Sequence, residues 1–157
     1  MHLKIVQALD QAGVPHSVHF HNLMRVAIRG PRDFAEALGY EVGRISKSLL
    51  LRATDRETFC VVVVSSDRRV ALERIAGFLQ VKRVQMANKE ELLRILDYPT
   101  TGVSPIGAGS VPVLMDERLM LFSSVLIGAG AVGIEIEISP DTLKKITGAV
   151  VMDIAQD

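Results

Sequence analysis

Lys47 is the side chain whose type and position point most directly to chemistry. It lies in the β-rich stretch Ile45–Leu51, where the alternation of a strand would place it on one face with Ile45, Leu49 and Leu51. A lysine is seldom buried on so apolar a face without a partner. It is either an edge lysine whose stem covers apolar surface, or a positioned ammonium that holds a phosphate or a carbonyl oxygen in a cleft. The pattern leaves both interpretations open.

A second candidate is the loop Gly102-Val-Ser104-Pro105-Ile-Gly107. Glycines let backbone N–H groups come close to a ligand, and proline stiffens the path of the chain. A loop of this composition can present amides to an oxyanion or to a carboxylate ester. It is equally consistent with a surface turn between a helix and a strand.

The segment Gly128–Gly133 matches the G-x-G-x-x-G pattern of dinucleotide-binding loops. Such a loop must open a helix, because the helix N-terminus holds the pyrophosphate. Here Gly133 runs into Ile134–Ile138, where isoleucine and glutamate alternate as they do in a strand. We therefore predict a glycine-rich β-turn, and no cofactor.

Three histidines, His16, His19 and His21, raise the question of a metal site, since His19 and His21 would share one face of a strand. No carboxylate or cysteine lies nearby in the sequence to complete a ligand set, so we expect polar or partly buried histidines and no metal. The single cysteine, Cys60, lies within the apolar run Phe59–Val64 and is expected to be a small buried hydrophobe rather than a nucleophile. No Ser-His-Asp order and no G-x-S-x-G elbow can be assembled.

Hydrophobic periodicity and turn residues predict the elements that must position these side chains. Ile45–Ala53 and Thr58–Ser65 are expected to form a hairpin, and the unbroken valines Val61–Val64 indicate a central strand buried on both faces. Further strands are predicted over Ser17–His21, Pro112–Asp116, Ser124–Ile127 and Gly133–Ile138, and helices over Leu3–Gly13, Arg32–Leu38, Val70–Leu79, Lys89–Leu96 and Thr142–Thr147.

Composition is typical of one globular domain. The chain has 157 residues, of which 48% are hydrophobic, and this excludes a disordered protein and allows a substantial core. Its longest apolar run, Phe59–Val64, has six residues, far short of the ~20 needed to span a bilayer. The N-terminus has the pattern of an amphipathic helix rather than of a signal peptide. We expect a single soluble, cytoplasmic α/β (α+β) domain over residues 1–157.

Charge is balanced overall but not along the chain. The 18 Lys and Arg residues equal the 18 Asp and Glu residues, which argues against a polybasic nucleic-acid binder. Residues 1–52 nevertheless carry seven Lys and Arg against four Asp and Glu, whereas residues 110–157 carry three against seven. An anionic partner is therefore expected to bind the first third of the chain.

Lys47 and the glycine–proline loop, in this order, resemble the YbaK/prolyl-tRNA synthetase editing-domain family, the free-standing aminoacyl-tRNA deacylases. The similarity extends over nearly the whole chain, from about Val6 to Ala155, and the ordered set of segments makes it specific. The matching segments are Phe34–Gly39, Ile45–Leu51, Gly102–Gly107, Val113–Asp116, Val125–Gly130 and Gly133–Pro140.

The resemblance implies a mixed, mostly antiparallel sheet surrounded by helices, and hydrolysis of the ester that joins a wrong amino acid to the tRNA 3′ end. Lys47 matches the family's key lysine, which positions the terminal adenosine and its phosphate or the scissile carbonyl, and Gly102–Gly107 matches the loop whose backbone orients the substrate. Family mechanisms use a water helped by a tRNA ribose hydroxyl, in agreement with the lack of a recognisable nucleophile. The candidate catalytic residues are thus Lys47, Gly102, Ser104, Pro105 and Gly107, and the candidate substrate-binding residues are Thr101, His21, Arg25, Asp116 and Gly128.

Two departures from the family pattern concern the expected pocket. Thr101 stands four residues before Pro105, where the family usually has glycine, and the stretch from His21 to Phe34 carries three arginines in place of a short Thr-containing helix start. We expect trans-editing of aminoacyl-tRNA, namely tRNA(Pro) that carries Ala, Cys, Ser or Thr, with the acceptor end as the bound partner. Prolyl-tRNA synthetase is a further candidate partner, and no membrane is involved. The alternative is a non-catalytic module of the same fold that binds a tRNA end or a synthetase.

Overall fold

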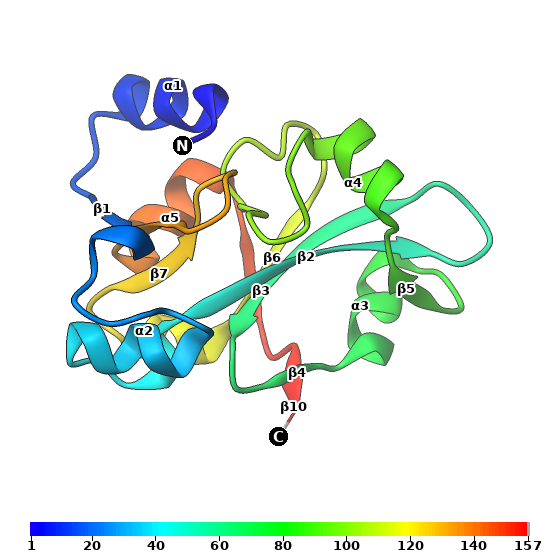
Figure 1. Cartoon of the computed structure of the whole chain (residues 1–157). Helices are drawn as coiled ribbons and strands as arrows, with labels where there is room; N and C mark the ends of the chain where they lie inside the picture. Colours follow the sequence, from blue (N-terminus) through cyan, green and yellow to red (C-terminus); the bar gives the residue numbers. More distant parts are fainter. Residues whose placement is uncertain (157) are drawn as a thin grey trace.

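A central sheet of five strands runs through the protein, and Figure 1 shows it in a computed structural model that describes residues 1–156. β2 (Ser46–Ala53) and β3 (Phe59–Ser65) form an antiparallel hairpin. β5 (Val84–Met86) pairs antiparallel with β2, whereas β6 (Val113–Asp116) and β9 (Val150–Met152) continue the sheet in parallel beyond β3. The predicted hairpin is confirmed, and the strand order is β5-β2-β3-β6-β9.

β3 is the middle strand of this sheet, and all of its residues are buried. Val61 and Val63 belong to the core on one face, while Cys60, Val62 and Val64 belong to the core on the other. The unbroken run of valines is therefore explained by burial on both faces, as predicted. Burial also raises the pKa of the Cys60 thiol to about 12, so this cysteine is the expected buried hydrophobe.

A second, antiparallel sheet has the order β1-β8-β7 and consists of β1 (Ser17–Phe20), β8 (Ile134–Ile138) and β7 (Val125–Gly128). Because side chains alternate along β8, its isoleucines join the main core and its two glutamates lie on the opposite face. A parallel bridge between Ile45 and Leu126 joins this sheet to the central one. The short strands β4 (Arg69–Val70) and β10 (Ala155–Gln156) pair with each other.

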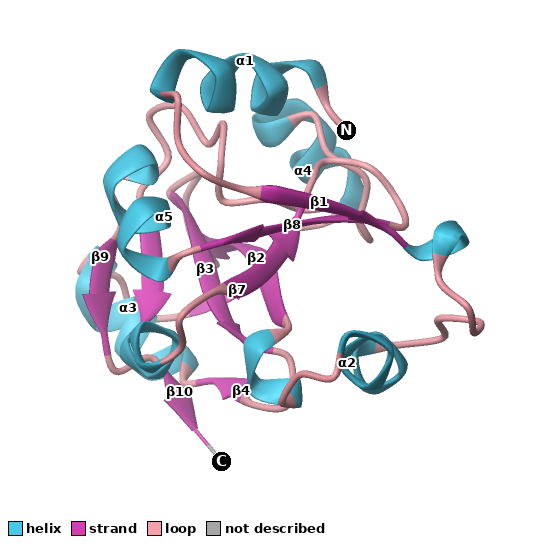
Figure 2. Ribbon diagram, turned by 90° about the vertical axis from the view of Figure 1, so that its left-hand side faces the viewer, coloured by secondary structure: helices cyan, strands magenta, loops and turns pink. Residues whose placement is uncertain are grey.

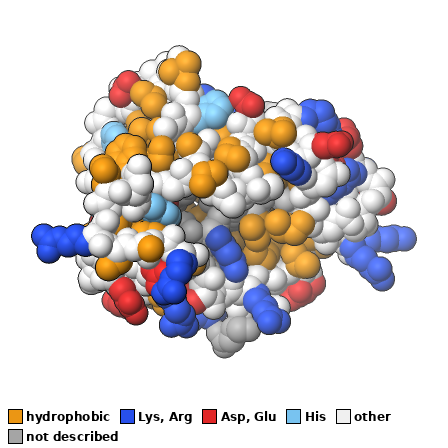
Figure 3. Space-filling view, viewed as in Figure 1, with side chains coloured by type: hydrophobic (Ala, Val, Ile, Leu, Met, Phe, Trp, Pro, Cys, Tyr) orange, Lys and Arg blue, Asp and Glu red, His pale blue; other side chains and the backbone are white. Residues whose placement is uncertain are grey.

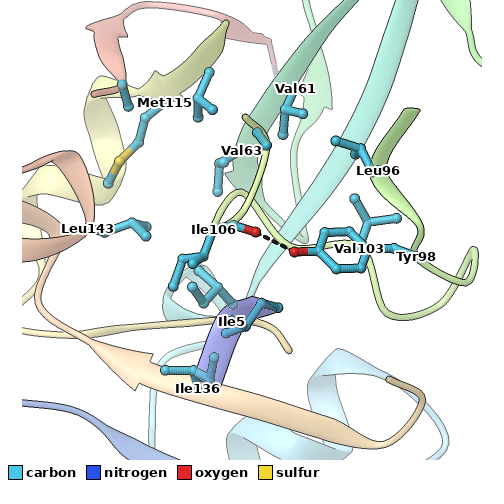
Figure 4. Close-up of a cluster of buried hydrophobic side chains, with 14 of the residues drawn as sticks. Ile5, Val61, Val63, Leu96, Tyr98, Val103, Ile106, Met115, Ile136 and Leu143 are labelled. Atoms are coloured by element: carbon cyan, nitrogen blue, oxygen red, sulfur yellow. Dashed lines mark hydrogen bonds between the residues drawn. The ribbon is translucent and has the colours of Figure 1, made fainter. Parts of the chain in front are cut away.

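Helices cover the outer faces of both sheets. The main core lies between the sheets and is completed by α1 (Leu3–Ala12), α4 (Lys89–Leu96) and α5 (Pro140–Thr147), and Figure 4 shows part of it around Ile5, Tyr98 and Ile106. α3 (Leu72–Leu79) covers the other face of the central sheet. α2 (Pro31–Leu38) packs through Phe34 against Ile45 and Leu126, and Figure 2 shows α1 and α2 on opposite sides of β1 and β8.

The predicted α+β class with a mixed, mostly antiparallel sheet is confirmed, although the strands divide into three sheets. The predicted helix Val70–Leu79 begins only at Leu72, because Arg69 and Val70 pair with β10. Four strands were not predicted, namely β4, β5, β9 and β10, each of two or three residues and thus too short for a hydrophobic period. Within residues 1–156, none of the helices is long and apolar enough to cross a bilayer.

The G-x-G-x-x-G segment forms a turn between two antiparallel strands, β7 and β8, as predicted. Gly130 and Gly133 take the left-handed backbone conformation, with φ of 76° and 75°. A residue with a side chain adopts this conformation at a cost, so these glycines are required by the turn.

Candidate active site

A cavity of about 490 Å³ opens where several parts of the chain meet. Its walls are the first half of β2, the start of α2 with the residues before it, the turn at residues 100–103 and the segment 128–135, and His21 and Ser66 add to the lining. Figure 3 shows a hollow near the middle of this face, with a histidine side chain on one side and Lys or Arg side chains on the other. This volume is in the usual range of small-molecule sites.

Lys47 lines this cavity from β2. It lies opposite Val64 of β3, and Leu49 and Leu51 on the same face pack into the core beneath α3, as the strand pattern predicted. Ile45 does not share this environment, because it precedes the strand and packs with Phe34. The Lys47 side chain is partly buried, and it has no hydrogen bond or ion pair in the described part of the chain. Its ammonium is therefore available to a ligand.

The cavity meets β2 at an open edge of the sheet. Four consecutive residues, Ser46 to Leu49, line it, although their side chains alternate between the two faces. β5 pairs with β2 only from Leu51 to Ala53, and the bridge at Ile45 lies at the other end. Over residues 1–156, no strand covers the edge between these points, so backbone N–H and C=O groups of this segment can bind a ligand.

Of the glycine–proline loop Gly102–Gly107, Val103 reaches the cavity, together with the two threonines that precede the loop. Thr100, Thr101 and Val103 line the wall, and the turn is closed by a hydrogen bond from the Gly102 N–H to the Pro99 carbonyl at 3.0 Å. Thr101 is exposed, so its side chain is at the mouth of the cavity. Of the candidate site residues, Thr101 thus lines the cavity, and Gly102 is part of the same turn.

The later residues of this loop point into the protein. Ser104 is fully buried, and its Oγ accepts the Ile106 N–H at 3.2 Å. Gly107 lies against Tyr98, whose hydroxyl donates a hydrogen bond to the Ile106 carbonyl (Figure 4). Ser104, Pro105 and Gly107 are thus absent from the lining of the cavity, and they hold the shape of the loop.

Two glycines allow this loop to touch the turn between β7 and β8. A Cβ atom on Gly128 would lie 2.1 Å from the Val103 carbonyl oxygen, and one on Gly102 would lie 2.7 Å from the Ala131 nitrogen. The Gly130 N–H also donates to the Gly102 carbonyl at 2.7 Å. The glycine motif therefore holds the wall of the cavity together, and Gly128 itself is part of the lining.

Two His–Glu pairs join β8 to the end of β1 and the 3-10 turn His21–Leu23 that follows it. His19 Nε2 lies 2.9 Å from Glu137 Oε1, and His21 Nε2 lies 2.6 Å from Glu135 Oε2. The reasoning that no carboxylate lies near the histidines is wrong in the folded chain, because β1 pairs with a strand more than a hundred residues away. Only His21 and Glu135 line the cavity. Across residues 1–156, no group of three or more His, Cys, Asp or Glu is placed to hold a metal ion.

The two carboxylates differ in their partners. Burial acts to raise the pKa of Glu137, but hydrogen bonds from Ser124, Tyr40 and His19 outweigh it and hold that pKa below its usual value. Glu135 has a single hydrogen bond, from His21, and burial raises its pKa. Glu135, the carboxylate on the cavity wall, thus accepts fewer hydrogen bonds than Glu137.

Two further polar groups in the cavity wall have no partner. The hydroxyls of Ser48 and Ser66 are buried and make no hydrogen bond to described residues. A buried hydroxyl without a hydrogen bond lowers the stability of the fold, so such groups either store strain or bind a ligand. Their position favours a ligand.

Arg25 and Asp116 lie outside this cavity. Arg25 lines a neighbouring hollow of about 390 Å³, which shares His21 with the site. Asp116 is fully buried in β6, where it binds Arg118 at 3.1 Å and accepts the Ile154 N–H at 3.1 Å. Through these contacts, Asp116 anchors the chain at Ile154, near the C-terminus, and has a structural role.

Residues 26–146 match the family model of the aminoacyl-tRNA editing domain. The chain belongs to the aminoacyl-tRNA editing domain family. The resemblance inferred from Lys47 and the glycine–proline loop is thereby confirmed.

Similar proteins include editing proteins and ligases. The chain is 30% identical over 114 residues to EbsC of Enterococcus faecalis, a candidate Cys-tRNA(Pro)/Cys-tRNA(Cys) deacylase, with 72% of this chain and 69% of EbsC covered. It is 27% identical to the proline–tRNA ligase of Thermosipho melanesiensis, with 64% of this chain but only 18% of the ligase covered. The editing domain thus spans about a fifth of such ligases.

A solved structure of a candidate trans-editing enzyme for prolyl-tRNA synthetase has the same fold. Its TM-score to this chain is 0.84 at 24% sequence identity, with 100% of this chain and 99% of that chain covered. This match shows the fold of the editing domain.

Sequence reasoning missed Glu135, Ser48 and Ser66 in the cavity wall. The alternation in Ile134–Ile138 did place Glu135 and Glu137 on one face, and His19 and His21 were also placed on one face of a strand. The missing information was the pairing of β1 with β8, which sequence alone does not give.

Proposed function

We propose that this editing domain hydrolyses the ester bond between a small amino acid and the 3′-terminal ribose of tRNA(Pro). One observation carries the proposal: the cavity contains Lys47, a cation with no protein partner within residues 1–156, at an open strand edge. A negatively charged or carbonyl oxygen of the acceptor end can supply that partner.

The chemical step needs little from the protein beyond positioning and charge. A water oxygen forms a bond to the ester carbonyl carbon, and the bond from that carbon to the ribose oxygen breaks. The water loses a proton and the departing ribose oxygen gains one, so the products are the free amino acid and the deacylated tRNA. Lys47 stabilises the negative charge that develops on the carbonyl oxygen, or it fixes the adjacent phosphate. The family resemblance implies that a ribose hydroxyl helps the water.

A hydrolase of this kind is needed mainly for small amino acids, which synthetases attach to the wrong tRNA most easily. Synthetase pockets separate side chains that differ by one methylene by only ~1–3 kcal/mol, so a second, hydrolytic selection is useful. The name of EbsC refers to both Cys-tRNA(Pro) and Cys-tRNA(Cys), and the first of these supports tRNA(Pro) as the carrier. Thr101 at the cavity mouth is the residue we expect to adjust which side chain is accepted.

A panel of charged tRNAs tests this proposal. Purified protein is incubated with tRNA(Pro) that carries Ala, Cys, Ser, Thr or Pro, and release of each amino acid is followed against a protein-free control. We expect at least one small residue to be released well above the control rate and Pro to be retained. Binding of these tRNAs without release of any amino acid would instead support a non-catalytic binding module.

A further inference from the structure

Glu135 and Glu137 form a natural comparison within one strand. Their side chains have similar exposed fractions, 15% and 16%, and each has a histidine partner, which lies in β1 for Glu137 and just after β1 for Glu135. Glu137 is also bound by Tyr40, Ser124 and Arg44. Glu135 accepts a hydrogen bond only from His21, on Oε2; His19 also acts on its charge, but Oε1 has no hydrogen-bond partner within residues 1–156.

A largely buried carboxylate with a single hydrogen bond is expected to be unfavourable unless a further group binds it. Glu137 lies outside the cavity and is completed by the protein itself. Glu135 lines the cavity, so the missing partner can come from a ligand. The partner has to be a hydrogen-bond donor, and a cation fits best because a charge-assisted hydrogen bond is stronger than a neutral one.

The aminoacyl ester contains one such group, the α-amino group, next to the carbonyl carbon that water attacks. Lys47 and Glu135 come from different walls of the same cavity, one from β2 and the other from β8. The Lys47 ammonium can therefore bind the carbonyl oxygen of the ester while the Glu135 carboxylate binds its α-amino group. Every aminoacyl-tRNA has this amino group, so its recognition would orient the ester whatever the side chain.

We propose that Glu135, held in place by His21, binds the α-ammonium group of the aminoacyl ester and thereby positions its carbonyl carbon for hydrolysis. This inference rests on the proposed deacylase function. Glu135 is assigned as a binding and positioning residue, and the protons of the hydrolytic step are not routed through it. The hydrogen bond from His21 leaves Oε1 of the carboxylate for the substrate.

The test replaces the ammonium group of the substrate by a neutral group of similar size. The tRNA carrying the amino acid that is released fastest is compared with the same tRNA carrying the corresponding α-hydroxy acid, made by deamination of the first. For each enzyme variant, the ratio of the two kcat/KM values is measured after subtraction of the protein-free rates. The ratio within one variant is insensitive to the amount of folded protein.

In the wild type we expect the aminoacyl ester to be strongly preferred. In Glu135→Gln, which keeps the shape but removes the charge, this preference should fall by about 10- to 100-fold, as expected for a hydrogen bond to a charged group. Glu135→Asp, which retains the charge on a shorter side chain, should lose part of the preference, and it serves in place of the glutamine variant if that one fails to fold. Glu137→Gln is the matched control and should keep the wild-type ratio.

An unchanged ratio in Glu135→Gln and Glu135→Asp would overturn the inference, as would an equal loss in Glu137→Gln or a wild type that does not prefer the amine. A loss confined to Ser- and Thr-charged tRNA would also overturn it, because Glu135 would then recognise the side chain. If the wild type releases no amino acid from any tRNA, the proposed function itself fails, which is a distinct result.

Discussion

Gly128→Ala is the substitution whose effect the structure predicts most sharply. The added Cβ would lie 2.1 Å from the Val103 carbonyl oxygen and 3.0 Å from the carbonyl carbon of the same residue. Ordinary contact begins at 3.4 Å, so the turn after β7 and the loop at Gly102 would have to move apart by at least 1.3 Å. Both partners are backbone, and neither can yield by a change of rotamer.

A separation of this size would also break the 2.7 Å hydrogen bond from the Gly130 N–H to the Gly102 carbonyl. Overpacking typically costs ~1–3 kcal/mol and a lost hydrogen bond ~1 kcal/mol, so we expect unfolding to become easier by ~2–4 kcal/mol. For a chain of this size that corresponds to a Tm lowered by about 5–15 °C.

The assay compares thermal unfolding and deacylation in Gly128→Ala and in a matched control, Gly77→Ala. A Cβ on Gly77 meets nothing within 4 Å, and Gly77 lies within α3, so this variant should be unchanged or stabilised by ~0.5–1 kcal/mol. At a temperature where both variants are folded, Gly128→Ala should also be slower, because one wall of the cavity has moved. A Gly128→Ala protein that melts and reacts like the wild type would refute this account of the cavity wall.

Three further predictions concern specificity, RNA binding and acid stability. Thr101→Gly should change the relative single-turnover rates on Ala-, Ser-, Cys- and Thr-tRNA(Pro) by roughly ten- to two-hundred-fold, and it should lower the free energy of unfolding by only ~0.5–1 kcal/mol. Rates that all shift by one factor would show that Thr101 does not contact the side chain of the amino acid. Binding to tRNA should weaken with salt, with a shallow slope of about −2 to −4 in a log–log plot, and some of Arg25, Arg29, Arg32, Arg44 and Arg52 should carry it. Three of these arginines already have partners within the protein: Arg29 pairs with Asp33, Arg44 with Ser124 and Arg52 with Glu91. An affinity independent of salt would contradict this prediction. The hydrogen bonds that lower the pKa of Glu137 in the folded state stabilise the protein fully above the unfolded value of ~4.3, and this contribution is lost as the pH falls through the lower folded value. Urea unfolding between pH 7 and pH 3 should therefore show a smaller loss of stability in Glu137→Gln than in the wild type, and equal losses would contradict the assignment.

Local sequence patterns were sufficient for most of the elements. Alternation in Ile134–Ile138 predicted β8 and excluded a dinucleotide-binding helix, and the unbroken Val61–Val64 predicted the central strand. The alternation around Lys47 placed this residue on the apolar face of β2, where the structure has it. These predictions hold because each depends on burial of one strand or helix face, which is set by near neighbours in the chain.

The arrangement of the site depends on contacts between distant segments, and these were not predictable. The pairing of β1 with β8 brings His21 to Glu135, and the approach of Gly102 to Ala131 forms the wall that carries Thr101. The resemblance to the family identified the loop but not which of its residues face the cavity, and Ser104 is buried away from it. The chemical character of a residue type was therefore predictable, whereas its orientation required the fold.

The role of Lys47 is tested most directly by single-turnover deacylation with the wild type and with Lys47→Ala. The released amino acid is measured on the mischarged tRNA(Pro) that the wild type hydrolyses fastest. Lys47 has no protein partner in residues 1–156, so its removal should leave Tm unchanged or slightly raised, while hydrolysis falls to the protein-free rate. A folded Lys47→Ala protein that releases the amino acid at a near wild-type rate would contradict the account.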